Sequence, residues 1–195
     1  MEKKEEEIRA NPTKGTEKIS PFRLSQISLW LDSYNNIFSD FDPRSYNQRA
    51  LSDDFLSEIK RASSDKASGS IELSFLIKKN KRNSADESTI KRRLKAHFKR
   101  HEELLKKEKN KIIVQGLLFS MAGVLLMFAA TIIIFRFGYT SLMLSFLIVM
   151  MEPAGWFSFW EGLNTMYFES KRVNPELEFY NKMNNAEIVF TSEGI

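Results

Sequence analysis

The sequence predicts a membrane α-helical hairpin of two transmembrane helices that carries a small cytoplasmic α+β domain of about three strands. An uncharged apolar run extends from Ile112 to Phe135, and a second apolar run, from Leu142 to Trp160, follows after a short break. The first run alone can cross about 30 Å of hydrocarbon as a helix, which satisfies its own backbone hydrogen bonds there. Outside these runs, short segments in which apolar and polar residues alternate indicate strands.

The composition leaves room for one small soluble domain beside the hairpin. The chain of 195 residues is 43% hydrophobic and 28% charged, yet residues 112–168 contain only Arg136, Glu152 and Glu161 as charged residues. There is no cysteine, which excludes disulfide frameworks, cysteine-ligated zinc and thiol nucleophiles. The sequence shows no catalytic, cofactor-binding or metal-ligating motif, so we expect that the protein is not an enzyme and uses no cofactor.

The basic residues beside the apolar runs predict the orientation of the hairpin. Lysine and arginine are retained on the cytoplasmic side of a membrane; they are frequent in residues 91–111, whereas the turn offers only Arg136. We therefore expect a multi-pass protein of the plasma (inner) membrane with both termini in the cytoplasm. This topology explains the net charge of +4 better than nucleic acid does, and the basic residues would also attract anionic headgroups.

Residues on both sides of the hairpin supply the soluble domain. Segments 27–31 and 71–77 alternate as strands, and residues 52–62 between them form a short helix, which leaves open a βαβ unit or an antiparallel pair with the helix packed on it. Residues 186–191 read as a last strand, too short to stand alone, that joins the same sheet. Pro175 is expected to open a short helix before it.

One long helix is predicted to lead from the domain into the membrane. Ser84 and Glu87 fit a capping box, and no proline or glycine follows until Gly116. The predicted segments are a disordered tail (1–22), the first part of the cytoplasmic domain (23–83), a long amphipathic helix (84–111), transmembrane helix 1 (112–135), an outer turn (136–141), transmembrane helix 2 kinked at Pro153 (142–168), and a C-terminal helix and strand that complete the domain (169–195).

Small residues line one face of each apolar run, because their spacings follow the helical repeat. Small residues let membrane helices approach closely, so the two faces are predicted to meet; the spacing leaves open whether they meet within one chain or between chains. The faces consist of Gly116, Ser120, Gly123 and Ala130 in the first run, and of Ser141, Ser145, Glu152, Gly155 and Gly162 in the second.

Glu152 and Pro153 are the candidate functional residues of the second run. Glu152 lies about eleven residues beyond the turn, which places it near the bilayer centre. An ionised carboxylate costs about 2.5–3.5 kcal/mol there, so we expect Glu152 to face protein or water, or to be protonated, with Ser120 as its hydrogen-bond partner. Pro153 removes a backbone donor and kinks the helix. The two residues fit a packing joint between helices or an ion or proton site.

Two other polar groups receive a structural interpretation. His97 and His101 are four residues apart on one helix face, a spacing compatible with a metal, but their basic neighbours repel a cation and no third ligand is evident; we expect a pair at the surface or packed on the sheet. The acidic turn at Asp42 lacks the spacing of an EF-hand, so we expect a turn with Arg44 or Arg49 as charge partner.

Several strings resemble a family of uncharacterised small bacterial two-span membrane proteins. They are FSDFDPR at 38–44, ALSDDFL at 50–56, and Gly-Trp-Phe followed by Trp-Glu-Gly within 155–162. The likeness extends over residues 27–190. It implies that the acidic turn and the aromatic hairpin belong to one recurrent design, and it implies no activity.

A narrower stretch resembles the mitochondrial calcium uniporter and its prokaryotic relatives, whose second span opens with Trp-Asp-x-x-Glu-Pro. Glu152 and Pro153 match the end of this signature, but Ile148 and Val149 stand where the family has tryptophan and aspartate. One of the two acidic rings is therefore missing, and a divalent ion needs several oxygen ligands. This departure argues against a calcium channel.

The sequence as a whole favours a non-enzymatic integral membrane protein whose cytoplasmic domain binds an unknown protein partner or assembles a homo-oligomer. An oligomeric ion channel or proton-coupled membrane protein that uses Glu152 is the alternative. A membrane enzyme comes third, because no nucleophile with a base, phosphate loop or metal motif is visible.

Overall fold

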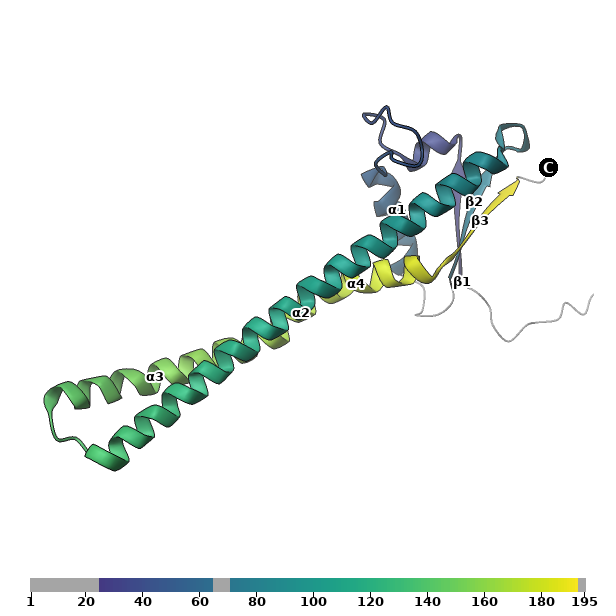
Figure 1. The fold of residues 1–195 in the computed structure, drawn as a ribbon. Helices are drawn as coiled ribbons and strands as arrows, with labels where there is room; N and C mark the ends of the chain where they lie inside the picture. The colour runs from purple at the N-terminus through teal and green to yellow at the C-terminus, as the bar shows by residue number, and fades with distance from the viewer. Residues whose placement is uncertain (1–24, 65–70, 193–195) are drawn as a thin grey trace, which may run out of the picture.

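The structure is a computed structural model that describes residues 25–64 and 71–192; the predicted tail over 1–22 lies outside them. Figure 1 shows a small domain from which one long helix extends to the tip of a hairpin. In chain order the elements are β1 (Ser25–Leu31), the 3-10 helix η1 (Tyr34–Ile37), α1 (Asp53–Ser64), β2 (Ile71–Ile77), the 3-10 helix η2 (Lys79–Lys81), α2 (Ser84–Phe137), α3 (Leu142–Asn164), the π-helix η3 (Thr165–Glu169), α4 (Ser170–Asn185) and β3 (Glu187–Ser192).

The three strands form a parallel sheet in the order β1-β2-β3. Of the two predicted arrangements, the βαβ unit is present: α1 connects β1 to its parallel neighbour β2. The C-terminal strand joins the same sheet, as predicted, and pairs Phe190 with Phe75. Parallel neighbours need a long crossover, and here the crossover from β2 to β3 is the entire hairpin. The sheet is therefore completed only by the chain that follows the hairpin.

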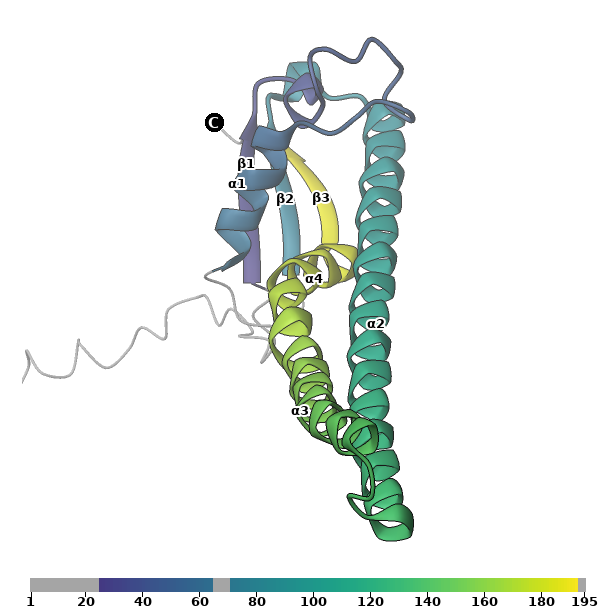
Figure 2. The same ribbon diagram turned by 90° about the vertical axis from the view of Figure 1, so that its left-hand side faces the viewer.

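The hydrophobic core lies between one face of the sheet and the helices. In Figure 2, α1 crosses in front of β1 and β2 while α2 runs alongside β3. The central strand β2 contributes Leu73, Phe75 and Ile77, which have no exposed surface; burying a side chain of this kind contributes about 1.5–3 kcal/mol. Buried side chains of three helices cover them: Ile90, Leu94 and Phe98 of α2, Phe55 and Ile59 of α1, and Phe179 and Met183 of α4.

The N-cap residue of the long helix α2 lies one position before the one that the sequence predicts. Its N-cap is Asn83, whose side-chain oxygen accepts a hydrogen bond from the N–H of Ala85 at 3.0 Å. The predicted capping box at Ser84 is therefore wrong. The preceding Asn83 takes the N-cap position, for which asparagine is at least as suitable as serine. The helix continues without a break to Phe137 and ends at Gly138, which has a positive φ of 60°, a conformation that glycine adopts without strain.

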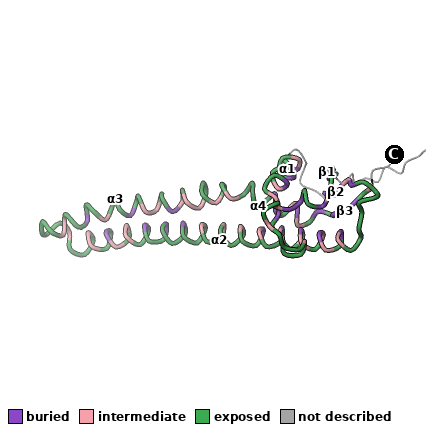
Figure 3. The backbone as a smooth tube through the Cα atoms, turned by 90° about the horizontal axis from the view of Figure 1, so that it is seen from above, coloured by how far each residue is buried: buried purple, intermediate pink, exposed green. Residues whose placement is uncertain are grey.

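The second helix of the hairpin continues through the π-helix η3 into α4. The prediction that Pro175 opens a short helix is therefore wrong, since Pro175 lies inside α4. Proline has no N–H to donate to the carbonyl four residues earlier, which belongs to Lys171. Lys171 and Pro175 are both exposed. Figure 3 shows that, outside the domain, buried positions of the hairpin lie where α2 and α3 face each other.

Candidate functional site

A narrow seam of small residues holds α2 against α3. Gly116 lies opposite Gly162, and Gly123 opposite Gly155; a Cβ added at Gly123 would lie 2.5 Å from the carbonyl oxygen of Gly155. The predicted small-residue faces thus meet within one chain. We define the seam by its buried residues, which are Gly116, Ser120, Gly123 and Ala130 on α2 and Ile148, Gly155 and Gly162 on α3.

Glu152 borders the seam but does not enter it. It follows Ile148 by four residues and precedes Gly155 by three, yet its side chain is exposed. The predicted hydrogen bond to Ser120 is wrong: Ser120 is 7% exposed and donates to the carbonyl oxygen of Phe159 at 3.2 Å. In the part of the chain that the structure describes, Glu152 has neither a hydrogen bond nor an ion pair. Ser141 and Ser145, predicted on the same face, are also outside the seam.

Pro153 lies inside α3 and is exposed next to Glu152. Because proline has no N–H, the carbonyl of Val149 loses the donor that a regular helix would provide. Val149 is 61% exposed. The step from Val149 to Pro153 therefore presents a carboxyl group on the outer surface of the hairpin, beside a carbonyl that lacks its helical donor.

Histidine and tyrosine rings pack α2 against α4. The ring centroids of His97 and His101 are 4.2 Å apart, and His101 stacks on Tyr180 at 5.0 Å. The Nε2 atom of His97 is buried without a hydrogen-bond partner. Burial, helped by the nearby charges of His101, Arg93 and Arg100, lowers the pKa of His97 to about 4. The pair therefore serves helix packing, not the sheet contact or surface position expected.

A buried carboxylate joins the start of α2 to the 3-10 helix η1. Glu87 is 7% exposed and accepts hydrogen bonds from the Tyr34 hydroxyl at 3.0 Å and from the Arg82 guanidinium at 2.8 and 2.9 Å. The Tyr34 oxygen in turn accepts from the N–H of Asn83 at 2.9 Å. The hydrogen bond from Arg82 lowers the pKa of Glu87, whereas burial raises the pKa of Tyr34. The network joins η1 to the cap of the long helix.

Asp42 organises the loop between η1 and α1. Its carboxylate accepts from the N–H of Ala50 at 2.7 Å and from the guanidinium of Arg44 at 2.8 Å, so the predicted turn with Arg44 as charge partner is confirmed. These hydrogen bonds, first that of Arg44, hold the pKa of Asp42 well below its usual range. The neighbouring Phe41 is 98% exposed. The loop lies at the end of the molecule opposite to the hairpin tip (Figure 2).

Sequence reasoning missed the polar contacts that tie the end of α4 to α2. Glu102 is 5% exposed and accepts a hydrogen bond from Asn184, 82 positions away, at 2.7 Å. The Lys95 amine donates to the carbonyl oxygens of Asn184 at 2.6 Å and Ala186 at 2.5 Å. The spacing of four between Glu102 and Lys106 was the only local signal, because the other partners come from the far end of the chain.

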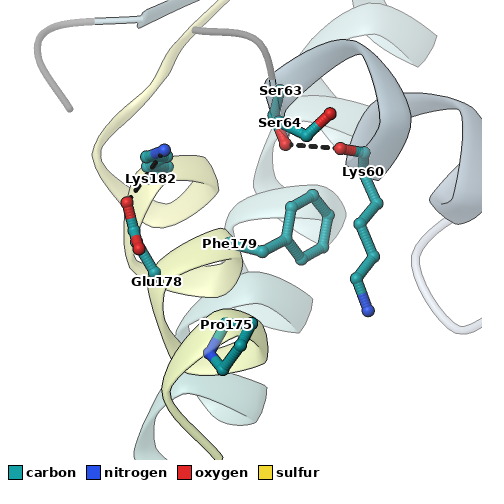
Figure 4. Close-up of a pocket in the computed structure, with 7 residues that line it drawn as sticks. All are labelled: Lys60, Ser63, Ser64, Pro175, Glu178, Phe179 and Lys182. Atoms are coloured by element: carbon teal, nitrogen blue, oxygen red, sulfur yellow. Dashed lines mark hydrogen bonds and ion pairs between the residues drawn. The ribbon is translucent and has the colours of Figure 1, made fainter. Parts of the chain in front are cut away.

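A shallow pocket of about 270 Å³ lies between α1 and α4. Figure 4 shows that the ring of Phe179 lies between these helices and that the polar groups bond to one another. The Ser63 hydroxyl donates to the Lys60 carbonyl at 2.9 Å, and Lys182 pairs with Glu178 at 3.0 Å. Across residues 25–64 and 71–192, no three His, Asp or Glu side chains are grouped to hold a metal ion. The pocket is therefore not a candidate metal site of that kind.

The candidate site is thus the exposed step at Glu152 and Pro153, with the seam as its support. The resemblances to two-span membrane proteins and to the calcium uniporter stay predictions. No family model, no curated protein and no solved structure matches the chain.

Proposed function

We propose that the chain is an integral membrane protein in which α2 and α3 span the bilayer and the α+β domain is a membrane-anchored interaction or assembly module. Both helices are long and apolar enough to cross a membrane. The observation that carries the proposal is their exposure: in the most apolar 18-residue stretch of each, 17% and 11% of the residues are buried. An apolar helix of a soluble core would bury most of these side chains, whereas lipid would cover them in a bilayer.

Aromatic and basic residues support a membrane boundary close to η3. Trp160, Tyr167 and Phe168 are between 51% and 63% exposed. The Lys171 amine lies 5.8 Å from the centre of the Tyr167 ring. Amphipathic rings settle at the headgroup level, and basic side chains there attract anionic headgroups. This boundary would place the domain and both ends of the hairpin in the cytoplasm.

The exposed ring of Phe41 supports the role in interaction. The hydrogen bonds of Asp42 tie the loop to Arg44 and Ala50, which would reduce the ordering that a partner has to impose on binding. Aromatic side chains that enter a pocket dominate the energetics of many interfaces. The loop lies at the end of the molecule opposite to the hairpin tip (Figure 2). A soluble protein could reach it there.

The exposure of Glu152 supports a second candidate function, an ion or proton pathway in an oligomer. A carboxyl group on the outer surface of a spanning hairpin could line an axis between copies. Flux into liposomes that contain the protein tests this function, with Glu152→Gln as the variant. Equal flux for both proteins, or none for the parent, excludes it.

Site-directed labelling tests the proposed topology. The chain has no cysteine, so Thr140→Cys in the turn and Ser192→Cys at the end of β3 each provide one thiol. We expect a membrane-impermeant maleimide to label the turn in intact cells and Ser192→Cys only after the cells are opened. We also expect the protein to stay in membranes washed with alkaline carbonate. Release by carbonate contradicts the proposal, and so does labelling at position 192 in intact cells.

A further inference from the structure

Glu152 has no binding partner in its own chain although it lies on an apolar surface. Its carboxyl group is exposed, and the residues that the structure describes give it no hydrogen bond or ion pair. The small residues of α2 that could have approached it are used by the seam. If the hairpin spans a bilayer, lipid tails would surround this carboxyl group and could not hydrogen-bond it. One copy of the chain therefore leaves the site incomplete.

The surface around Glu152 suits the approach of another helix. Ser145 is small and lies seven residues before Glu152, on the same side of α3. Its hydroxyl already donates to the carbonyl oxygen of Ser141 at 3.0 Å, so it needs no further acceptor. The carbonyl of Val149 lacks its helical donor because of Pro153. We name Ser145, Val149 and Glu152 the Glu152 strip.

We propose that the Glu152 strip is the contact between two copies of this chain, in which the two Glu152 carboxyl groups hydrogen-bond each other. A neutral carboxyl group has one O–H donor together with acceptor oxygens, so it is complementary to itself. A two-fold axis along the membrane normal brings the same residue of both copies to the same depth. Any other membrane protein would have to provide a matching polar group, whereas a second copy always does. The inference rests on the proposed function, since it requires lipid around the hairpin.

Disulfide cross-linking in native membranes tests the contact with a matched control. Val149 and Met150 are adjacent and similarly exposed, at 61% and 54%, but Val149 is three residues from Glu152 and shares its side, while Met150 points away. We expect the variants Ser145→Cys and Val149→Cys to form a covalent dimer on oxidation, with a yield several-fold above that of Met150→Cys, whose thiol would lie on another side of α3. Because the chain has no other cysteine, each variant can form only a covalent dimer. Equal yields at the three positions overturn the proposal.

Two further substitutions in the Val149→Cys chain test the carboxyl pair itself. Glu152→Gln keeps one donor group and one acceptor, so we expect it to retain cross-linking. Glu152→Leu keeps the apolar bulk without the polar atoms, and we expect it to reduce the dimer about tenfold, as for loss of one interhelical hydrogen-bonded pair. Retention with leucine, or loss with glutamine, overturns the pairing.

Extraction of the same membranes separates the two proposals. Protein that alkaline carbonate removes would refute the membrane span, and with it the proposed function. Protein that resists carbonate but cross-links equally at positions 149 and 150 would leave the membrane span intact and refute the Glu152 contact alone.

Discussion

Gly123 of α2 and Gly155 of α3 are in mutual backbone contact. A Cβ at Gly155 would lie 2.9 Å from the carbonyl oxygen of Gly123, and a Cβ at Gly123 would lie 2.5 Å from that of Gly155. Buried seam positions recur every seven residues on both sides of this contact: 116, 123 and 130 on α2, and 148, 155 and 162 on α3. This repeat keeps two helices in contact over several turns, and the glycines set their register.

Gly155→Leu is expected to destabilise the hairpin. A Cβ there would meet the Met127 side chain at 2.7 Å and the Gly123 carbonyl oxygen at 2.9 Å, and the backbone oxygen cannot move aside as the side chain can. Overpacking of this kind costs about 1–3 kcal/mol. The matched control is Ala154→Leu, because Ala154 is the exposed neighbour on α3. Thermal unfolding in detergent, followed by near-UV circular dichroism, compares the two. An equal loss of stability in both variants would contradict the seam.

Tyr34→Phe is expected to loosen the start of α2. It removes the hydrogen bond to Glu87 and leaves the N–H of Asn83 without its acceptor, a loss of about 1–3 kcal/mol. Hydrogen exchange of the amides in the first turn of α2 measures the effect. Tyr46→Phe is the control, since the Tyr46 hydroxyl makes an exposed, longer hydrogen bond of 3.3 Å to Asn35. Equal exchange in the two variants would refute this role of Tyr34.

The contact between α2 and α4 is expected to weaken as the pH falls from 8 to 5. Unfolded histidine titrates near 6.5, whereas the pKa of His97 is about 4 in the folded protein, so the unfolded chain binds more protons in this range and stability decreases. Linkage gives a loss of about 2 kcal/mol at pH 5. His101, Arg93 and Arg100 on α2 face His97, together with the Tyr180 ring of α4.

Unfolding measured across this pH range, for the parent and for His97→Phe, tests the effect. We expect the variant to lose most of the pH dependence above pH 5, where the ion-paired carboxylates stay charged. A parent curve that is flat between pH 8 and 5 contradicts the prediction.

The long helix and the hairpin were predictable because each rests on a local pattern. The stretch from Ser84 to Gln115 contains no helix breaker, and the apolar runs are long. The capping box failed because Glu87 takes a tertiary partner instead: Tyr34 is 53 positions away. The helix start predicted at Pro175 was wrong because the sequence does not distinguish a proline in the first turn of a helix from a proline on its exposed side.

The candidate site was predictable in its residues but not in its partners. Counting residues from the turn placed Ser120 near Glu152, yet the seam sets the register and pairs Ser120 with Phe159. Periodicity placed Glu152 on the small-residue side of α3, and it does border the seam there. Its exposure depends on how closely the two backbones approach at Gly123 and Gly155, which no local pattern encodes.

Asp42→Asn is expected to release the loop that carries Phe41. The carboxylate of Asp42 binds Arg44 and the N–H of Ala50 at the same time, and an amide cannot accept both as strongly because it lacks the charge. We expect the Ala50 amide to exchange with solvent several-fold faster, since local opening follows the loss of its acceptor. Asp40→Asn is the control, because the Asp40 side chain is 90% exposed and makes only a long ion pair of 3.9 Å with Arg49. Faster exchange in both variants would show that the loop responds to net charge, and unchanged exchange in both would show that the backbone alone maintains it.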